Sequence, residues 1–183
     1  MGVLEIMAEI IFVGFGGQGI IRSAIITGKG AAIFDNKSAT MTQSFGPEAR
    51  GGACSSQLVI SDSKVLYPYV ESADVLVAMS QEGYEKFESE LSEEGVLLID
   101  EDLVKPKSQP GRDKIKIFPI PATRIAEELG NKIIANVVML GFFTAVTKLI
   151  PKTAMEKAVT DSVPSRFVEL NLKAFNKGFQ HKK

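Results

Sequence analysis

Cysteine and histidine, the residues that build most metal and nucleophile sites, are almost absent from this chain. Its 183 residues include one cysteine, Cys54, and one histidine, His181. A single cysteine cannot form an intrachain disulfide or hold a four-cysteine zinc or iron–sulfur site. His181 lies beside the C-terminal end, where order is least expected, so histidine-based zinc sites and Ser-His or Cys-His nucleophile pairs lack a ligand or a base. Any redox or hydrolytic chemistry therefore needs groups from another molecule.

An excess of positive charge is absent as well. Lysine and arginine number 21 against 22 aspartates and glutamates, which gives a net charge of -1. Because a surface that binds nucleic acid needs a basic face, this balance argues against nucleic acid as the main partner. It leaves room for one local anion-binding site.

Long apolar runs and export signals are also missing. The most apolar late stretch, 133–150, is interrupted by polar residues such as Asn136, and its longest unbroken run, 137–143, is too short for a membrane span. A spanning helix needs about 20 apolar residues, so the pattern predicts a buried helix and no membrane association. Glu5 and Glu9 stand where a signal peptide would carry basic residues, and we expect a cytoplasmic protein.

What remains is the composition of a globular α/β protein. Apolar residues make up 45% and charged residues 23% of the chain, which suffices for a substantial core. Short apolar runs alternate with stretches of helical spacing, and this alternation indicates βαβ units with a sheet covered on both faces. We expect strands over 10–13, 38–42, 54–60, 75–79, 96–99 and 114–118, and helices over 20–34, 80–91, 123–130, 133–150, 151–161 and 164–179. The pattern predicts one domain, 1–183, folded as a three-layer α/β/α sandwich around a mainly parallel or mixed sheet, with C-terminal helices from about residue 151.

Single residues mark several of the expected boundaries. Asp35 and Asn36 form a turn after the first helix, and Ser80 is a suitable N-cap for the second. Pro119 is expected to end the last strand. The loop 105–112 resembles a linker in composition but is too short to separate two domains.

The first candidate site is the segment GFGGQG, 14–19, between the first expected strand and the first helix. Glycines let the chain turn tightly and expose backbone N–H groups, while the N-terminus of the following helix attracts negative charge. The spacing therefore favours a phosphate or pyrophosphate ligand. The binding residues that it predicts here are Gly14, Gly16, Gly17, Gln18 and Gly19. A tight strand–helix turn without a ligand is the alternative.

A dinucleotide-binding fold would need, in addition, an acidic residue at the end of a second strand about 20 residues farther along. Asp35 has nearly the right spacing. However, the helical spacing over 21–32 leaves no room for a strand before it, so we interpret Asp35 as a solvated residue at a helix end. NAD is therefore the weaker ligand interpretation.

The second candidate site is the segment QSFGPEARGG, 43–52. Gly46, which precedes a proline, indicates a turn. Arg50 followed by Gly51 and Gly52 places a guanidinium beside accessible backbone donors, an arrangement that suits a phosphate or a carboxylate. A hairpin or crossover loop in which Arg50 pairs with Glu48 or another carboxylate is an equal alternative. Because both glycine-rich segments follow strands, a parallel sheet would bring them to the same carboxyl edge, where α/β proteins bind ligands.

Other candidates are weaker. Cys54 is expected to pack as a small buried residue rather than to react. The acidic group 100–102 is interpreted as a solvated loop and cap at a strand end rather than as a metal site. The basic residues near the C-terminus are expected to form a solvated end, with a docking role as the minor alternative: Lys173, Lys177, Lys182 and Lys183.

Together, the two motifs resemble those of the gamma subunits of the 2-oxoacid:ferredoxin oxidoreductases. GFGGQG after the opening strand, followed by QSFGPEARGG, is most similar to gamma subunits of the 2-oxoglutarate and branched-chain 2-oxoacid enzymes, and the resemblance covers about 9–161. It implies that alpha and beta subunits carry out oxidative decarboxylation on thiamine diphosphate. Iron–sulfur clusters would lie in the beta subunit or a small delta subunit, with ferredoxin as the electron acceptor.

For this chain, the resemblance implies a supporting role without a complete active site or a metal site. The absence of a GDG thiamine diphosphate signature and the single cysteine agree with that role. By the resemblance, residues 16–19 would approach the pyrophosphate or the pantetheine arm of coenzyme A. Ser44, Arg50, Gly51 and Gly52 would lie opposite, with Arg50 as the counter-ion.

The expected function is thus to support the coenzyme A-dependent oxidative decarboxylation of a 2-oxoacid, with 2-oxoglutarate as the first candidate. Two alternatives remain open. One is a Rossmann-like oxidoreductase that binds NAD or a flavin, and the other is a purely structural assembly subunit. Self-association of the isolated chain is also open.

Overall fold

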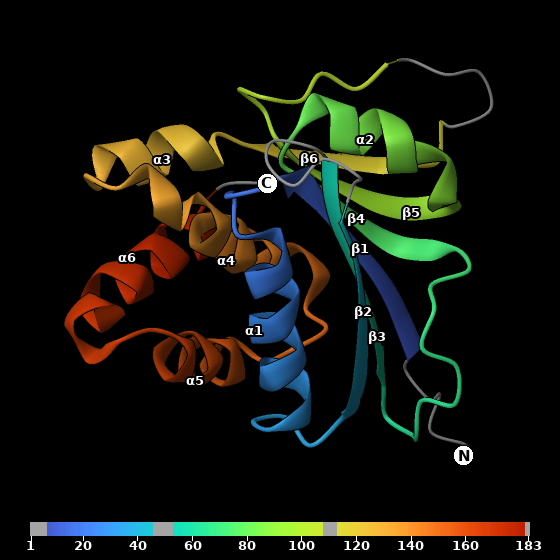
Figure 1. The fold of residues 1–183 in the computed structure, drawn as a ribbon, viewed down its shortest axis with the longest axis horizontal. Helices are drawn as coiled ribbons and strands as arrows, with labels where there is room; N and C mark the ends of the chain where they lie inside the picture. The colour runs from blue at the N-terminus through green and yellow to red at the C-terminus, as the bar shows by residue number, and fades with distance from the viewer. Residues whose placement is uncertain (1–6, 46–52, 108–112, 182–183) are drawn as a thin grey trace.

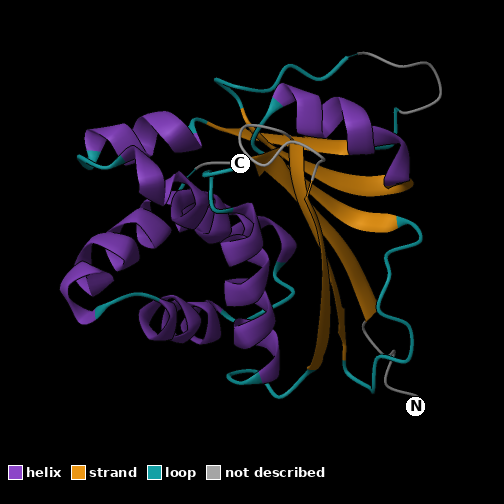
Figure 2. Ribbon diagram, viewed as in Figure 1, coloured by secondary structure: helices purple, strands orange, loops and turns teal. Residues whose placement is uncertain are grey.

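A six-stranded sheet with helices on both faces forms the framework of the protein in the computed structural model, which describes residues 7–45, 53–107 and 113–181 (Figures 1 and 2). The strands are β1 (Met7–Phe15), β2 (Ser38–Phe45), β3 (Ala53–Ser61), β4 (Ala73–Ala78), β5 (Leu91–Asp100) and β6 (Lys116–Ile120). The helices are α1 (Ile20–Ala32), α2 (Gln81–Phe87), α3 (Ala122–Glu128), α4 (Ala135–Thr147), α5 (Lys152–Ser162) and α6 (Val168–Phe179). Short 3-10 helices cover Glu88–Glu90, Lys132–Ile134 and Ser165–Phe167. The predicted α/β class is confirmed.

The sheet is mixed, with the strand order β2-β3-β1-β4-β5-β6. β1, β4, β5 and β6 are parallel neighbours in that order, whereas β3 is antiparallel to both β1 and β2. The sheet is thus mixed, which is one of the two arrangements that the sequence predicts, and β3 is the strand that departs from the βαβ pattern. Because β3 is antiparallel to both of its neighbours, β1 and β2 still run in the same direction.

The two faces of the sheet carry cores of unequal size. On β1, Ile10 and Phe12 point into the larger core, which α1, α3, α4, α5 and α6 complete. Ile11 points to the opposite face, where Tyr84 and Phe87 of α2 close a smaller core. Figure 1 shows this division, with α2 alone on one side of the sheet and the other helices on the other side. The alternation follows from the period of two along a strand.

The apolar stretch 133–150 forms the buried helix α4, as its sequence predicts. α4 crosses α6 at two glycines, Gly141 and Gly178. A Cβ on Gly141 would clash with the backbone carbonyl oxygen of Phe175, and one on Gly178 would clash with that of Val138. The two helices therefore pack backbone against backbone at this crossing. In the described part of the chain, no helix combines the length and the apolar character needed to cross a bilayer.

Two expected boundaries are wrong. α2 ends at Phe87, and β5 begins at Leu91, whereas the helix was expected to run to 91 and the strand to begin at 96. After the 3-10 helix Glu88–Glu90 the backbone is already extended at Leu91, with φ -74° and ψ 130°, and the Leu91 side chain packs in the smaller core. Pro119 lies inside β6 instead of ending the strand. β6 is an edge strand, where the missing N–H of proline requires no sheet partner.

Other local signals are confirmed. Asn36 adopts a left-handed conformation with φ 55° in the turn after α1. Ser80 is the N-cap of α2, and its Oγ accepts a hydrogen bond from the backbone N–H of Gly83 at 3.1 Å. Cap residues of this kind satisfy a donor that the helix itself leaves unpaired.

Candidate functional site

The first glycine-rich segment forms a tight turn between the end of β1 and the start of α1. Gly17 and Gly19 have φ values of 95° and 76°, a left-handed region that residues with a Cβ rarely adopt. The backbone N–H of Gln18 donates to the carbonyl oxygen of Phe15 at 3.1 Å, which closes the turn. The glycines are thus required by the backbone geometry of the turn itself.

The side chain of Gln18 fastens this turn to the sheet. Its Oε1 accepts a hydrogen bond from the backbone N–H of Phe15 at 2.7 Å, and its Nε2 donates to the carbonyl oxygen of Met79, just after β4, at 2.8 Å. A Cβ on Gly14 would lie 2.6 Å from Gln18 Oε1, so this glycine gives the amide its room. The contacts join the ends of two parallel neighbouring strands through one side chain.

The N-terminus of α1 has no side-chain cap. Gly19 occupies the N-cap position without a side-chain acceptor, and the first turn of the helix contains no acidic residue. The first backbone N–H groups of a helix have no partner within the helix, and the dipole of the 13-residue helix adds partial positive charge there. This end of α1 is therefore suited to an anion such as a phosphate.

Asn136, on the first turn of α4, lies against the same turn from the helical layer. It is only 4% exposed, and its Nδ2 donates to the carbonyl oxygen of Gly19 at 3.4 Å. A Cβ on Gly19 would lie 2.6 Å from Asn136 Nδ2. Asn136 is not among the residues that the sequence motifs predict for the site. The available signal was a polar residue within the apolar stretch 133–150.

The second glycine-rich segment is described only at its start. Ser44 lies near the end of β2 and is exposed, whereas Gly46, Arg50, Gly51 and Gly52 lie outside the described residues. Cys54 on β3 is opposite Gly14 on β1 and opposite Phe45 on β2. The carboxyl ends of β1 and β2 therefore lie at the same end of the sheet. They meet there through the antiparallel β3, not through the parallel pairing on which the expectation was based.

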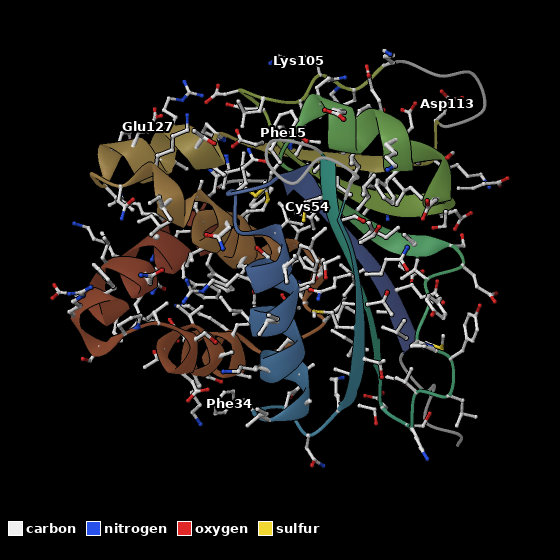
Figure 3. The ribbon with its side chains drawn as sticks, in the orientation of Figure 1. Phe15, Phe34, Cys54, Lys105, Asp113 and Glu127 are labelled. Atoms are coloured by element: carbon white, nitrogen blue, oxygen red, sulfur yellow. The ribbon has the colours of Figure 1, made fainter. Side chains whose placement is uncertain are left out.

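Cys54 is a packing residue, as expected. It is 8% exposed and belongs to the larger core, and burial raises the pKa of its thiol. A raised pKa keeps the thiol protonated at neutral pH and lowers its reactivity. Figure 3 shows Cys54 near Phe15, at the end of the sheet that carries the glycine turn.

Asp35 lies at the other end of α1, about 20 Å from the turn by the rise of a 13-residue helix. Figure 3 shows its neighbour Phe34 at that far end. The Asp35 carboxylate is 3.9 Å from Lys37 Nζ and is partly buried. This position supports the interpretation that Asp35 is a helix-end residue rather than a ribose ligand.

One expectation about a polar residue is wrong. Asp100 is fully buried, not solvated: its carboxylate accepts hydrogen bonds from the backbone N–H and Oγ1 of Thr123 at 2.9 and 2.6 Å and from the N–H of Asp102 at 3.3 Å. Burial raises the pKa of Asp100, and the bonds from Thr123 oppose that rise. The ring of His181 packs edge-on against Phe142 of α4, with 5.6 Å between the ring centroids.

The remaining candidates show no metal chemistry. Among the described residues, no three His, Cys, Asp or Glu side chains are grouped so that they could hold a metal ion. Lys173 and Lys177 are exposed on α6, and Lys182 and Lys183 lie outside the described residues.

Known proteins of similar sequence and known proteins of similar structure indicate the same family. The family described as pyruvate ferredoxin/flavodoxin oxidoreductase matches residues 9–181. The chain is 49% identical to the 2-oxoglutarate synthase subunit KorC of Methanocaldococcus jannaschii, over 97% of this chain and 95% of that protein.

Two solved structures share the fold. The gamma subunit of the keto/oxoacid ferredoxin oxidoreductase from Geobacter sulfurreducens superposes with a TM-score of 0.82 at 43% identity, covering 94% of this chain and 96% of that chain. The 2-oxoglutarate:ferredoxin oxidoreductase from Magnetococcus marinus, solved with 2-oxoglutarate, coenzyme A and succinyl-CoA bound, gives a TM-score of 0.83 at 23% identity. That match covers 94% of this chain and 30% of that chain.

Proposed function

Because the chain belongs to the pyruvate ferredoxin/flavodoxin oxidoreductase family, we propose that it is the gamma subunit of a 2-oxoglutarate:ferredoxin oxidoreductase and contributes to coenzyme A binding. The identity of 49% to a 2-oxoglutarate synthase subunit over nearly the full length of both chains supports this substrate. The resemblance of the two glycine-rich segments to gamma subunits points to the same class.

One observation supports the coenzyme A role above all others: the uncapped N-terminus of α1 behind the glycine turn. Coenzyme A carries a pyrophosphate and a further phosphate, the kind of group that a free helix N-terminus binds. The neighbour from Magnetococcus marinus was solved with this same compound. In this proposal residues 16–19 face the phosphates, and the second glycine-rich segment, with Ser44 and Arg50, provides the other side.

The redox groups of the family do not fit this chain. One cysteine in the whole sequence cannot supply the ligands of an iron–sulfur cluster. We therefore assign thiamine diphosphate and the clusters to partner subunits, with ferredoxin as the acceptor of the complex. The contribution of this chain is to hold and orient the thiol substrate, because fixing one reactant in place lowers the entropic barrier to its reaction.

A pair of substitutions at Gly17 tests the binding site. A Cβ there would have no atom within 4 Å, so a side chain has room, but any residue other than glycine is strained at φ 95°. The test therefore compares two substitutions that share this strain and differ in charge. In the oxidoreductase co-expressed with its partner subunits, Gly17→Asp places a carboxylate where the phosphates should bind, and Gly17→Asn is the neutral control of nearly equal shape. We expect the aspartate variant to raise KM for coenzyme A roughly tenfold over the asparagine variant, with kcat at saturating coenzyme A retained. Equal KM values in the two variants would contradict a phosphate at this helix end.

Arg50→Ala tests the second segment in the same assay. A raised KM for coenzyme A with assembly intact supports the role of Arg50 as counter-ion, whereas unchanged kinetics favour a scaffolding role for that segment.

Titration of the complex with NADH and with coenzyme A distinguishes the proposed coenzyme A site from a dinucleotide-binding site. Micromolar NADH binding without a response to coenzyme A would replace the present proposal.

A further inference from the structure

We propose that Asn136 is a positioning residue for the coenzyme A site, which it does not touch itself: it holds Gly19 and thereby sets the start of α1. The inference rests on the proposed function. The two residues are far apart in sequence, since the donor and the acceptor of their hydrogen bond are separated by 117 positions. Nothing in the glycine motif itself indicates such a support.

The contact is one of shape as well as hydrogen bonding. A Cβ on Gly19 would lie 2.6 Å from Nδ2 and 2.9 Å from Cγ of Asn136. The amide group therefore fills the space that a side chain at position 19 would take, on the inner side of the turn. The carbonyl oxygen of Gly19, which accepts the bond from Asn136, also accepts the first hydrogen bond of α1, from Ser23 N–H at 2.8 Å.

Asn136 differs from other asparagines on the helices of this protein. Asn171 donates to the carbonyl oxygen of Phe167, the N-cap of α6, and Asn176 donates to that of Leu172 and also to Glu156 Oε1 of α5 at 3.2 Å. Both keep a bond to a carbonyl oxygen at the start of or within their own helix, whereas the bond of Asn136 goes to Gly19. Asn136 does not cap α4, whose N-cap is Ile134 with no side-chain cap bond. Its amide points out of its own helix, toward the turn.

The burial of this amide calls for an explanation. Asn136 is 4% exposed on a helix whose other buried residues are mostly apolar. A buried amide is unfavourable unless it is hydrogen-bonded, and an apolar residue would suit the core better. A need to hold the turn accounts for a polar side chain at this position.

Gln18 supports the turn from the sheet side. Both ends of its amide bind within the fold, to Phe15 N–H and to the Met79 carbonyl oxygen. Gly19 is thus held between a side chain fixed to β4 and a side chain fixed to α4. The direction of the free N–H groups of α1 depends on these two anchors, and hydrogen bonds to a bound phosphate weaken when their donors are misaligned.

The test uses the complex co-expressed with its partner subunits and compares Asn136→Ala with Asn171→Ala. Asn171 is the matched control, because it is 5% exposed and loses a single hydrogen bond within its own helix. We expect both variants to lower the melting temperature by a similar amount. Only Asn136→Ala should raise KM for coenzyme A, by about tenfold, while kcat at saturating coenzyme A and KM for 2-oxoglutarate stay within about twofold.

A double variant shows whether Asn136 acts through Gly19. Asn136→Ala removes the two atoms that a Cβ at position 19 would meet most closely, Nδ2 and Cγ, and leaves only the Cβ of residue 136 at the ordinary contact distance of 3.4 Å. The KM effects of Gly19→Ala and Asn136→Ala should therefore be less than additive. Additive effects would overturn the proposal. If Asn136→Ala prevents assembly, Asn136→Ser is measured in its place with the same expectations.

The remaining outcomes separate this inference from the proposed function. If Asn136→Ala leaves KM for coenzyme A unchanged while Gly17→Asp raises it, the positioning role is wrong and the binding site stands. If neither variant changes that KM, the binding site itself is wrong, and the positioning role is wrong with it.

Discussion

Glycine is required in two regions of this molecule for opposite reasons. In the turn 14–19, Gly17 and Gly19 have positive φ values, and what matters is the conformation of the backbone. At the crossing of α4 and α6, Gly141 and Gly178 lie in regular helices, and what matters is that a neighbouring backbone occupies the place of a Cβ. One region uses glycine to expose backbone groups, and the other uses it to bury backbone against backbone. Substitution by alanine should therefore affect function at the first and stability at the second.

The largest effect is expected at the helix crossing. Gly178→Ala or Gly141→Ala must push α4 and α6 apart, because the atoms in the way are backbone carbonyl groups that cannot rotate aside. We expect a loss of about 3 kcal/mol in the free energy of unfolding and a melting temperature lower by about 10 °C. Chemical and thermal denaturation measure both. A loss below that of an ordinary surface substitution would contradict the backbone contact.

Gly19→Ala should have the next largest effect, divided between stability and binding. A residue with a Cβ at φ 76° is strained by about 1–2 kcal/mol, and here it also displaces Asn136. Gly130 is the matched control, since it has φ 86° and no atom within 4 Å of a Cβ. We expect similar strain in Gly130→Ala, but a raised KM for coenzyme A only in Gly19→Ala. An equal KM for coenzyme A in both variants would contradict a role of Gly19 in binding.

Gly30→Ala in α1 should be nearly neutral, although a Cβ there would lie 2.7 Å from Met155 Sδ. The sulfur belongs to a flexible side chain that can adopt another rotamer, and alanine favours a helix over glycine by up to about 1 kcal/mol. We expect a change in the free energy of unfolding within about 1 kcal/mol. A loss as large as that of Gly178→Ala would show that side-chain and backbone contacts are equally restrictive here.

Gly28→Ala should give the smallest effect, with the opposite sign. Its Cβ would meet only Leu58 Cδ1, at the ordinary contact distance of 3.4 Å. The gain in helix propensity should then raise the free energy of unfolding by about 0.5 kcal/mol. Denaturant titration beside the wild type measures this gain, and a clear loss would indicate that α1 and β3 pack more tightly than this distance implies.

Much of the architecture could be predicted from the sequence, because local pattern and burial agree in most elements. The helical spacing after the glycine turn gave α1 and placed Asp35 at a helix end, and the apolar stretch 133–150 gave α4. The family resemblance, based on the two glycine-rich motifs, is also confirmed. Such motifs are short and local, and so are the turns that they form.

What could not be predicted depends on contacts between distant segments. The seven residues between β2 and β3 are too few for a parallel crossover and favour a hairpin. The pairing of β3 with β1, however, joins distant segments, and no local pattern indicates it. Asp100 belongs to an acidic group that looks solvated, yet Thr123 of α3 provides donors that allow it to be buried. Asn136 reaches a turn that is 117 residues away, and no spacing rule covers that distance.

The close crossing of α4 and α6 has a mechanical consequence for the glycine turn. α4 contacts Gly19 through its first turn and α6 through its middle, where two backbones meet without side chains between them. Helices that pack through side chains can shift relative to one another when those side chains change rotamer. Where backbone contacts backbone, as here, no rotamer change can accommodate such a shift. A displacement of α6 should therefore move α4 with it, and α4 should pass that displacement on to Gly19 at the start of α1.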